Sequence, residues 1–332
     1  AELKDGSKVV VKIIKSDFEA SFKRDVQRLK RWIRIGLFFR PKLRKVGNPI
    51  GLLAHIEDYT LRELNLLNEI DGRNQLIAHA KAIETHFAMP KLKFPKMWEA
   101  LSNEHILVME EITHPTLESH LEAGTFTWPD MLELFRIHGA FMFGLGTFHG
   151  DLHPGNAMMD DQGNFLFIDT GAICNAPEHV RNALFGFFYF LAKGELKNAF
   201  DAMLTMAAVR PTGKTLDTYY ASMNELYDGF VGTSVSEVSL TQQMMKTVKA
   251  AVLAGCAFGE EAFPIIRSLM YMDGMVLKGH PSVDLISSMG PYLDEFSVLI
   301  DPNSIIQALS LIHISRAHET LRYLVCRLLL EK

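Results

Sequence analysis

The chain has 332 residues, of which 48% are hydrophobic, and a formal net charge of −5 at pH 7. This length and composition are typical of one large or two modest globular domains, and the slightly acidic balance argues against a nucleic-acid-binding protein. The three cysteines lie far apart and form no disulfide or metal pattern. No apolar run is long enough for a transmembrane helix, and the sequence shows no signal peptide. We therefore expect a cytoplasmic globular protein without a nucleic-acid partner.

The first residues predict a strand. The sequence starts at Ala1 without a methionine, directly on a strand-like segment, so we expect a fragment of a longer protein. Residues 2–15 predict a β-hairpin, because an Asp-Gly pair favours a tight turn and three consecutive valines follow it. Lys12 ends this valine run. In the protein-kinase pattern, a lysine at this place on a strand contacts the nucleotide phosphates.

The segment 17–45 is both basic and apolar. Its apolar residues follow helical spacing, and between positions 22 and 45 ten Lys or Arg residues stand against a single acid. Such a helix could bury its apolar stripe in a core and expose the basic face to water, which is the interpretation we favour. Alternatively, it could lie on an anionic membrane surface, which would make the protein peripheral on the inner face of a membrane.

A long helix is expected at 50–87, and it contains the sequence E-L-N-L-L-N-E at 63–69. Kinases use a helix glutamate to hold the phosphate-binding lysine through an ion pair. Glu63 and Glu69 are both candidates, but they do not share one helix face, so only one of them can pair with Lys12. Both could also be ordinary surface glutamates.

The next segment predicts strands at Phe94 and 105–109, followed by a hinge. In the run Met-Glu-Glu-Ile at 109–112, Glu110 and Ile112 are the candidates for binding adenine, because backbone groups of such a hinge hydrogen-bond the base in kinases. Helices are expected at 116–123 and 128–148.

Residues 148–173, FHGDLHPGNAMMDDQGNFLFIDTGAI, combine three polar side chains at a suggestive spacing. Asp151 and Asn156 share one loop, and a short apolar strand at 165–168 leads to Asp169, which Thr and Gly follow. The order H-G-D-x-x-x-x-N and D-T-G matches the kinase pattern H-R-D-x-x-x-x-N and D-F-G. A polar loop with acids placed by chance is the alternative.

This pattern suits phosphoryl transfer from a nucleotide. The reaction needs a carboxylate to orient the attacking hydroxyl, a role that Asp151 could fill. It also needs oxygen ligands for Mg²⁺, which is usually held by one or two carboxylates together with phosphate. Asn156 and Asp169 are the candidate metal ligands.

The rest of the chain predicts helices without a further chemical motif. They are expected at 177–192, 195–208, 215–231, 236–257, 260–277 and 282–300. The segment 310–332 resembles translated adaptor sequence, so we expect either a non-native tail or an amphipathic helix there.

Four motifs together resemble the UbiB/ADCK family of atypical kinases. They are E-L-N-L-L-N-E, L-V-M-E-E-I, F-H-G-D-L-H-P-G-N and I-D-T-G, and the resemblance extends over about residues 2–208. It implies a protein-kinase-like fold that binds Mg-ATP. It also implies a role in ubiquinone (coenzyme Q) biosynthesis, as an ATPase acting on membrane-bound lipid intermediates or their enzymes.

The resemblance assigns roles to individual residues. It implies that Lys12 binds phosphate, Glu69 is its helix partner, Glu63 is the first acid of a Glu-x-Asp motif, Asp151 is the catalytic-loop aspartate, and Asn156 and Asp169 bind the metal. Asn65 stands where that motif often has Asp. The nucleotide loop of the family would lie before Ala1, and the transmembrane hairpin of many bacterial members is not visible.

Two other functions remain open. A small-molecule phosphotransferase of the aminoglycoside or choline kinase type shares H-G-D-L-H-P-G-N, although that group often has an aromatic where this chain has Thr170. A non-catalytic nucleotide- or lipid-binding scaffold is the third.

The predicted fold is α+β and bilobal, of the protein-kinase-like type. The small lobe, truncated, is expected at 1–112 and includes the basic helix. The mainly helical large lobe, which carries the catalytic loop, is expected at 113–302, with Mg-ATP bound between the lobes.

Overall fold

The computed structural model describes residues 1–15, 18–39, 64–259 and 262–300, with positions 50, 51, 53, 54, 57, 60 and 61. Glu63 and the tail 310–332 lie outside the described residues. The chain forms two compact units, each built from separate segments. The first comprises Ala1–Ala78, Lys91–His114 and Met158–Ile173, and the second comprises the remaining segments His79–Pro90, Pro115–Ala157 and Cys174–Lys332. The predicted lobe boundaries stay a prediction.

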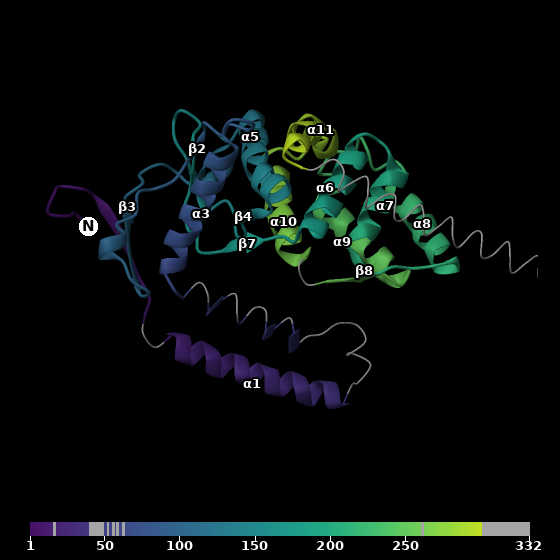
Figure 1. Cartoon of the computed structure of the whole chain (residues 1–332), viewed down its shortest axis with the longest axis horizontal. Coiled ribbons are helices and arrows are strands. Elements are labelled where there is room, and N and C mark those ends of the chain that lie inside the picture. Colours follow the sequence, from purple (N-terminus) through teal and green to yellow (C-terminus); the bar gives the residue numbers. More distant parts are fainter. Residues whose placement is uncertain are drawn as a thin grey trace, which may run out of the picture. The chain divides into compact units, whose positions relative to one another are not determined.

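The first unit contains two small sheets and long helices (Figure 1). Its elements are β1 (Val9–Ile13), α1 (Phe18–Phe39), α3 (Leu67–Ile83), β2 (Leu92–Lys93), β3 (Ile106–Glu110), β5 (Ala157–Met159) and β6 (Phe165–Phe167). The end of α3, from His79, and Ala157 of β5 belong to the second unit. A short 3-10 turn, η2 (Glu99–Leu101), precedes β3. β1 pairs antiparallel with β3 so that Lys12 lies opposite Leu107, and β2, β6 and β5 form the second sheet.

The hairpin expected at 2–15 is present only as a single bridge. Glu2 pairs with Lys8 around the predicted Asp-Gly turn, and the longer pairing of β1 is with β3, almost a hundred positions later in the chain. The valine run is therefore a strand, as its β-branched residues indicate, but its main partner is distant.

The predicted single helix over 50–87 is wrong, because the chain leaves the helix at 64–66 and re-enters it at Leu67. The side-chain oxygen of Asn65 accepts the backbone N–H of Leu67 at 3.1 Å, and the N–H of Leu66 donates to the carbonyl of Glu104 at 3.0 Å. A short polar side chain that bonds its own backbone competes with helix continuation and favours a new helix start. The break places α3, and with it Glu69, independently of the preceding turns.

A small hydrophobic core supports the first unit. Leu66, just before α3, and Ile70, in its first turn, pack with Leu107 and Met109 of β3 and with Met97. Helix and sheet thus share one buried layer, which fixes the strand that carries Lys12 against the helix that carries Glu69.

The second unit is mainly helical. Its helices are α4 (Leu117–Ala123), α5 (Trp128–Gly139), the π-helical turn η3 (Ala140–Leu145), α6 (Glu178–Ala192), α7 (Leu196–Met206), α8 (Lys214–Tyr227), α9 (Leu240–Leu253), α10 (Phe263–Gly279), α11 (Leu285–Phe296) and the 3-10 turn η5 (Ser297–Leu299). Short strands pair as β4 (Thr147–His149) with β7 (Ile173–Asn175) and β8 (Ala207–Val209) with β9 (Ala257–Phe258). The sequence predicted none of these four strands.

The helix expected at 128–148 ends earlier, at Leu145. Gly146 has φ 76, a left-handed conformation that ends the helix, and β4 follows directly. The core around this point is aromatic, since the ring of Phe143 lies near those of Phe185, Phe188 and Phe296. Within the described ranges, no helix combines the length and the apolar character needed to cross a bilayer.

Candidate functional site

Lys12 and Glu69 form an ion pair in the first unit. The Lys12 ammonium lies 3.1 Å from Oε1 and 2.9 Å from Oε2 of Glu69, whose side chain is only 7% exposed. Burial raises the pKa of the Glu69 carboxyl, although Lys12 opposes the shift. A buried carboxylate with a bidentate ammonium partner holds the lysine in one place.

Asp169 lies beside this pair. Its Oδ2 is 3.7 Å from the Lys12 ammonium, and its side chain is 49% exposed, so the carboxylate remains open to a ligand. Asp169 has φ 55, the left-handed backbone region that a non-glycine residue seldom adopts. Backbone strain of this kind persists only where the surroundings enforce it.

The surroundings that enforce it come from α3. The buried hydroxyl of Thr170 donates to the Glu69 carbonyl at 2.6 Å. A Cβ added to Gly72 would lie 2.0 Å from the Thr170 carbonyl oxygen, and one added to Gly171 would lie 3.2 Å from Cγ of Glu69. The D-T-G turn is thus packed directly on the helix that carries the glutamate.

The catalytic-loop candidates lie in the second unit and hold one another by local hydrogen bonds. The Asp151 N–H donates to Nδ1 of His149 at 3.2 Å, and the Asn156 amide nitrogen donates to the Asp151 carbonyl at 3.0 Å. These bonds define the loop but leave the Asp151 carboxylate outside it. One carboxylate oxygen, Oδ1, accepts the hydroxyl of Tyr271 at 2.7 Å.

Each unit carries one of the two predicted metal ligands, and both have oxygen donors that suit a hard cation such as Mg²⁺. Because the Asn156 nitrogen is used in the loop, its side-chain oxygen is the group left for a ligand. In the first unit, the half-exposed carboxylate of Asp169 is an oxygen donor of the kind that Mg²⁺ prefers. No cluster of three or more His, Cys, Asp or Glu side chains that could hold a metal alone occurs in the part of the chain that the structure describes.

The predicted hinge residues follow the end of β3. The Glu110 carboxylate accepts the N–H of Lys96 at 3.0 Å, so this side chain stabilises the neighbouring backbone. Between 64 and 259, no backbone hydrogen bond involves Ile112, whose peptide groups are therefore available to a ligand.

Sequence reasoning missed Tyr271 and Thr170 as parts of the site. Tyr271 is 120 positions from Asp151, and no motif surrounds it. The sequence marks Thr170 only as a departure from the aromatic residue of small-molecule kinases, although its hydroxyl joins the D-T-G turn to α3.

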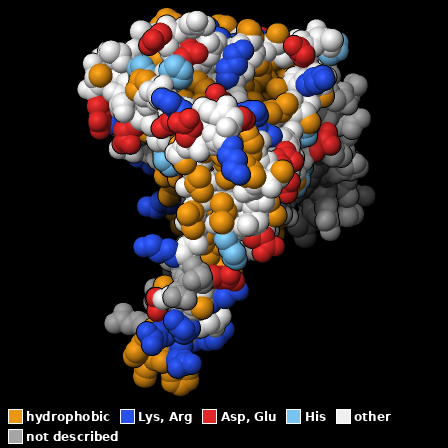
Figure 2. Space-filling view, turned by 90° about the vertical axis from the view of Figure 1, so that its left-hand side faces the viewer, with side chains coloured by type: hydrophobic (Ala, Val, Ile, Leu, Met, Phe, Trp, Pro, Cys, Tyr) orange, Lys and Arg blue, Asp and Glu red, His pale blue; other side chains and the backbone are white. Residues whose placement is uncertain are grey.

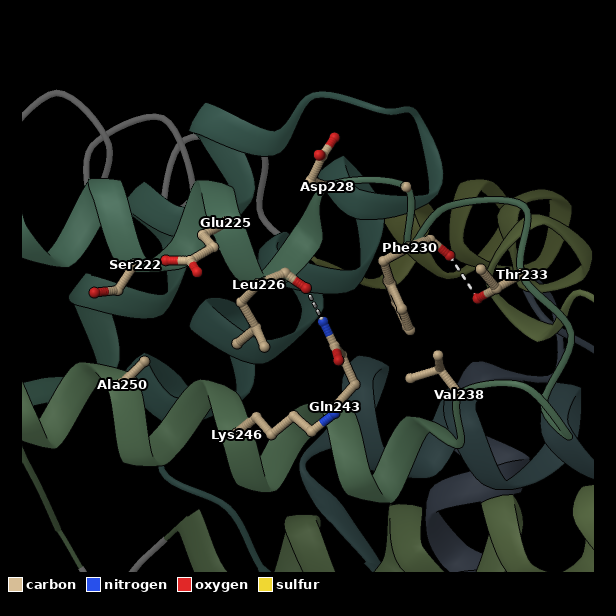
Figure 3. A pocket seen from close by; sticks show the side chains of 11 residues that line it. Ser222, Glu225, Leu226, Asp228, Phe230, Thr233, Val238, Gln243, Lys246 and Ala250 are labelled. Atoms are coloured by element: carbon tan, nitrogen blue, oxygen red, sulfur yellow. Dashed lines mark hydrogen bonds between the residues drawn. The ribbon is translucent and has the colours of Figure 1, made fainter.

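A separate pocket of about 480 Å³ lies at α8 and α9 (Figure 3). In it, the Gln243 amide nitrogen donates to the Leu226 carbonyl at 2.7 Å. Its charged residues, Glu225, Asp228 and Lys246, carry both signs, and it contains none of the predicted site residues. Nothing in its lining selects a ligand.

The chain resembles known proteins over most of its length. A family model described as the ABC1 atypical kinase-like domain matches residues 1–203. The chain is 23% identical to "Probable protein kinase UbiB" of Histophilus somni over 296 residues, which cover 87% of this chain and 53% of that protein. It is 22% identical to the protein of the same name from Aeromonas salmonicida, over 88% of this chain and 53% of that protein. The chain thus spans about half the length of these curated relatives.

A solved structure shares the fold. The complex of Rv3197 with erythromycin from Mycobacterium tuberculosis superposes with a TM-score of 0.55 at 17% identity, over 89% of this chain and 73% of that chain. Together with the family match, this confirms the predicted α+β, helix-rich, kinase-like fold.

Proposed function

Because the chain belongs to the ABC1 atypical kinase-like family, we propose that it is an ATP-dependent phosphotransferase or ATPase of the UbiB type. The observation that carries the proposal is the ion pair of Lys12 with the buried Glu69, with Asp169 beside it. Kinases hold their phosphate-binding lysine by such a pair. A chance polar loop would not place these residues, which are far apart in the chain, within one ion-pair network.

In the proposed mechanism, each residue acts on a bound ATP molecule. Lys12 contacts the phosphates, and Glu69 keeps the lysine in place. Asn156 and Asp169 would hold Mg²⁺, which when bound would neutralise charge on the phosphoryl group. Asp151 orients the attacking water or hydroxyl. The N–H of Glu110 already donates to the Lys96 carbonyl at 2.8 Å, so the Glu110 carbonyl and the backbone of Ile112 are the groups that would bind the adenine.

Magnesium-dependent nucleotide binding tests this proposal. Calorimetric titration of the wild-type chain with ATP, ADP and GTP should show binding of the adenine nucleotides that requires Mg²⁺ and is lost in Asp169→Asn. Asp217→Asn, an exposed aspartate on α8, is the control for a lost charge and should bind as wild type does. Absence of any Mg²⁺-dependent adenine nucleotide binding by the wild type would contradict the proposal.

The acceptor that we propose is a phenolic isoprenoid-lipid precursor or water, in support of ubiquinone or related lipid synthesis. The UbiB part of the relatives' printed name supports the link to ubiquinone, and the choice of acceptor is our proposal. Phosphate release from ATP should then rise when phenolic lipid mimics are added. Phosphorylation of an amine- or choline-bearing alcohol would favour the small-molecule kinase instead, and nucleotide binding without any turnover would favour the scaffold.

A peripheral membrane contact through α1 accompanies this proposal. The helix buries Val26 and Leu37 on one side. Its other sides expose large apolar residues, with Trp32 69%, Phe38 78% and Phe39 75% exposed. Figure 2 shows Lys and Arg side chains beside hydrophobic ones at the lower end of the view, where α1 lies.

This composition is complementary to an anionic lipid surface. Aromatic side chains enter the headgroup region, and each nearby Lys or Arg adds about 1 kcal/mol of attraction to anionic lipid. Exposed basic residues on α1 are Lys23, Arg24, Arg28, Arg31 and Arg34. An anionic lipid surface is therefore the partner that we propose for α1.

Sedimentation with vesicles tests the contact. The triple variant Arg28→Glu, Arg31→Glu and Arg34→Glu should lose binding to vesicles that contain anionic lipid, by about a hundredfold or more given about 1 kcal/mol per residue. A matched control reverses Lys214, Lys246 and Lys249, which are exposed on α8 and α9, and should still sediment. Equal binding by the α1 variant and the wild type would remove the proposed contact.

A further inference from the structure

Tyr271 contacts the candidate catalytic loop from a distant helix of the same unit. It lies on α10, and its hydroxyl donates to Oδ1 of Asp151 at 2.7 Å. Its ring also meets the imidazole of His153 edge to face, with centroids 6.0 Å apart. One side chain thus touches two residues of the H-G-D-L-H sequence.

α10 is held firmly on both sides of Tyr271. Ser268 is fully buried and hydrogen-bonds Nε2 of His138 on α5. Asp273, 3% exposed, accepts the N–H groups of Leu240 and Thr241 at 3.0 Å each, at the start of α9. Anchors three residues before and two residues after Tyr271 fix its place relative to α5 and α9.

The loop fixes only the backbone of Asp151. Its N–H donates to His149 and its carbonyl accepts from Asn156, and neither bond restrains rotation of the carboxylate. The Tyr271 hydroxyl bonds Oδ1 and so sets that rotation, which leaves Oδ2 to accept a proton or to orient a hydroxyl. A reacting group displaced by about 1 Å can lose about a hundredfold in rate.

We propose that Tyr271 is a positioning residue for Asp151, which aims the second carboxylate oxygen at the attacking hydroxyl or water. This inference rests on the proposed function. It goes beyond that function because it assigns a role in turnover to a helix outside the kinase motifs. Tyr271 does not touch the nucleotide in this role, so its loss affects the rate and not nucleotide affinity.

The variant Tyr271→Phe removes only the hydroxyl. We expect kcat for Mg-ATP turnover to fall about tenfold to a hundredfold, while KM for ATP and the melting temperature stay close to wild type. Tyr292→Phe is the matched control, because Tyr292 is a half-buried tyrosine whose ring packs on Phe135 and whose hydroxyl makes no hydrogen bond within the described ranges. It should keep the wild-type kcat.

A double-mutant cycle with Asp151→Asn separates positioning from other roles. If Tyr271 acts through Asp151, adding Tyr271→Phe to Asp151→Asn should lower kcat little further. An equal fall in both backgrounds, or an unchanged kcat in Tyr271→Phe, would overturn the inference while wild-type turnover still supported the proposed function. A wild-type chain that binds no Mg-ATP and has no turnover would overturn both.

Discussion

The ammonium of Lys12 lies 2.9 Å from Oε2 of Glu69, although the two residues are 57 positions apart. Burial raises the pKa of this glutamate, and Asp169 nearby adds to the shift, while Lys12 lowers it. The charged form of Glu69 is needed to hold Lys12, but burying that charge lowers the free energy of unfolding. The requirements of the proposed function and of stability therefore conflict at this residue.

Glu69→Gln should change how the free energy of unfolding depends on pH. A carboxyl whose pKa is raised by folding adds stability below its unfolded pKa of about 4.3 and loses it as pH rises through the folded value. The unfolding free energy of the Gln variant, relative to wild type, should therefore increase between pH 4 and 7 in denaturant titrations. ATP affinity should fall, because Lys12 loses its partner.

Asp71→Asn is the control for this experiment, since Asp71 is exposed on the same helix. It should leave both the pH profile and ATP affinity as in the wild type. A fall in the unfolding free energy of Glu69→Gln relative to wild type between pH 4 and 7 would show that the ion pair, rather than burial, dominates at Glu69.

Gly72→Ala should disturb the D-T-G turn. Its added Cβ would lie 2.0 Å from the Thr170 carbonyl oxygen and 2.7 Å from Cγ1 of Ile173. The nearer of these atoms belongs to the backbone of the turn, which can move away only if the turn or α3 shifts. We expect a loss of about 1–3 kcal/mol in unfolding free energy, as for other overpacked sites, together with weaker Mg-ATP binding, because Asp169 precedes the displaced residue.

The matched control is Gly36→Ala. Gly36 is exposed within α1, and a Cβ there meets no atom of the described residues within 4 Å. This substitution should stabilise the chain by about 0.5–1 kcal/mol, because alanine favours a helix interior over glycine. If both glycine variants changed stability equally, the packing of α3 on the turn would not be the cause.

How far the sequence predicts this structure depends on whether each signal is local. The strand leading to Lys12 and the loop bearing Asp151 follow from β-branched residues and from a motif with fixed spacing. The helix break at Asn65 has a local cause too, but one Asn within an otherwise helical pattern is a weak signal.

Other features depend on contacts that local patterns do not contain. β1 pairs with β3 across a long intervening sequence, and which glutamate meets Lys12 follows from that pairing and from the packing of α3. The bond of Tyr271 to Asp151 requires the placement of α10 against α5, which periodicity alone leaves undetermined.

His138 should make the fold sensitive to acid. It is fully buried, and desolvation lowers its pKa to about 3, with His149 adding a smaller repulsion. A base whose pKa is lowered by folding gives stability above its unfolded pKa of about 6.5, and that stability is lost as pH falls towards the folded value. Between pH 6.5 and 5, the loss should be about 2 kcal/mol in unfolding free energy.

His138→Gln should flatten this acid dependence in urea titrations at several pH values, whatever it does to stability at neutral pH. His179→Gln, an exposed histidine on α6, should keep the wild-type slope. A wild-type slope in His138→Gln would mean that other groups cause the loss of stability in acid.

The two aspartates of the motifs should separate into different kinetic classes. Asp151→Asn removes the group that orients the attacking oxygen, so kcat should fall by about 10²–10⁴, with nucleotide affinity nearly unchanged. Asp169→Asn removes an oxygen ligand beside Lys12, so Mg²⁺-dependent affinity should fall severalfold or more. Calorimetry with ATP and phosphate-release assays, run with Mg²⁺ and with a chelator, measure the two effects.

The chelator should abolish the difference in affinity between Asp169→Asn and the wild type, because that difference depends on the metal. Equal losses of nucleotide affinity in both variants would contradict this division of roles, because Asp151 would then be part of the nucleotide site itself.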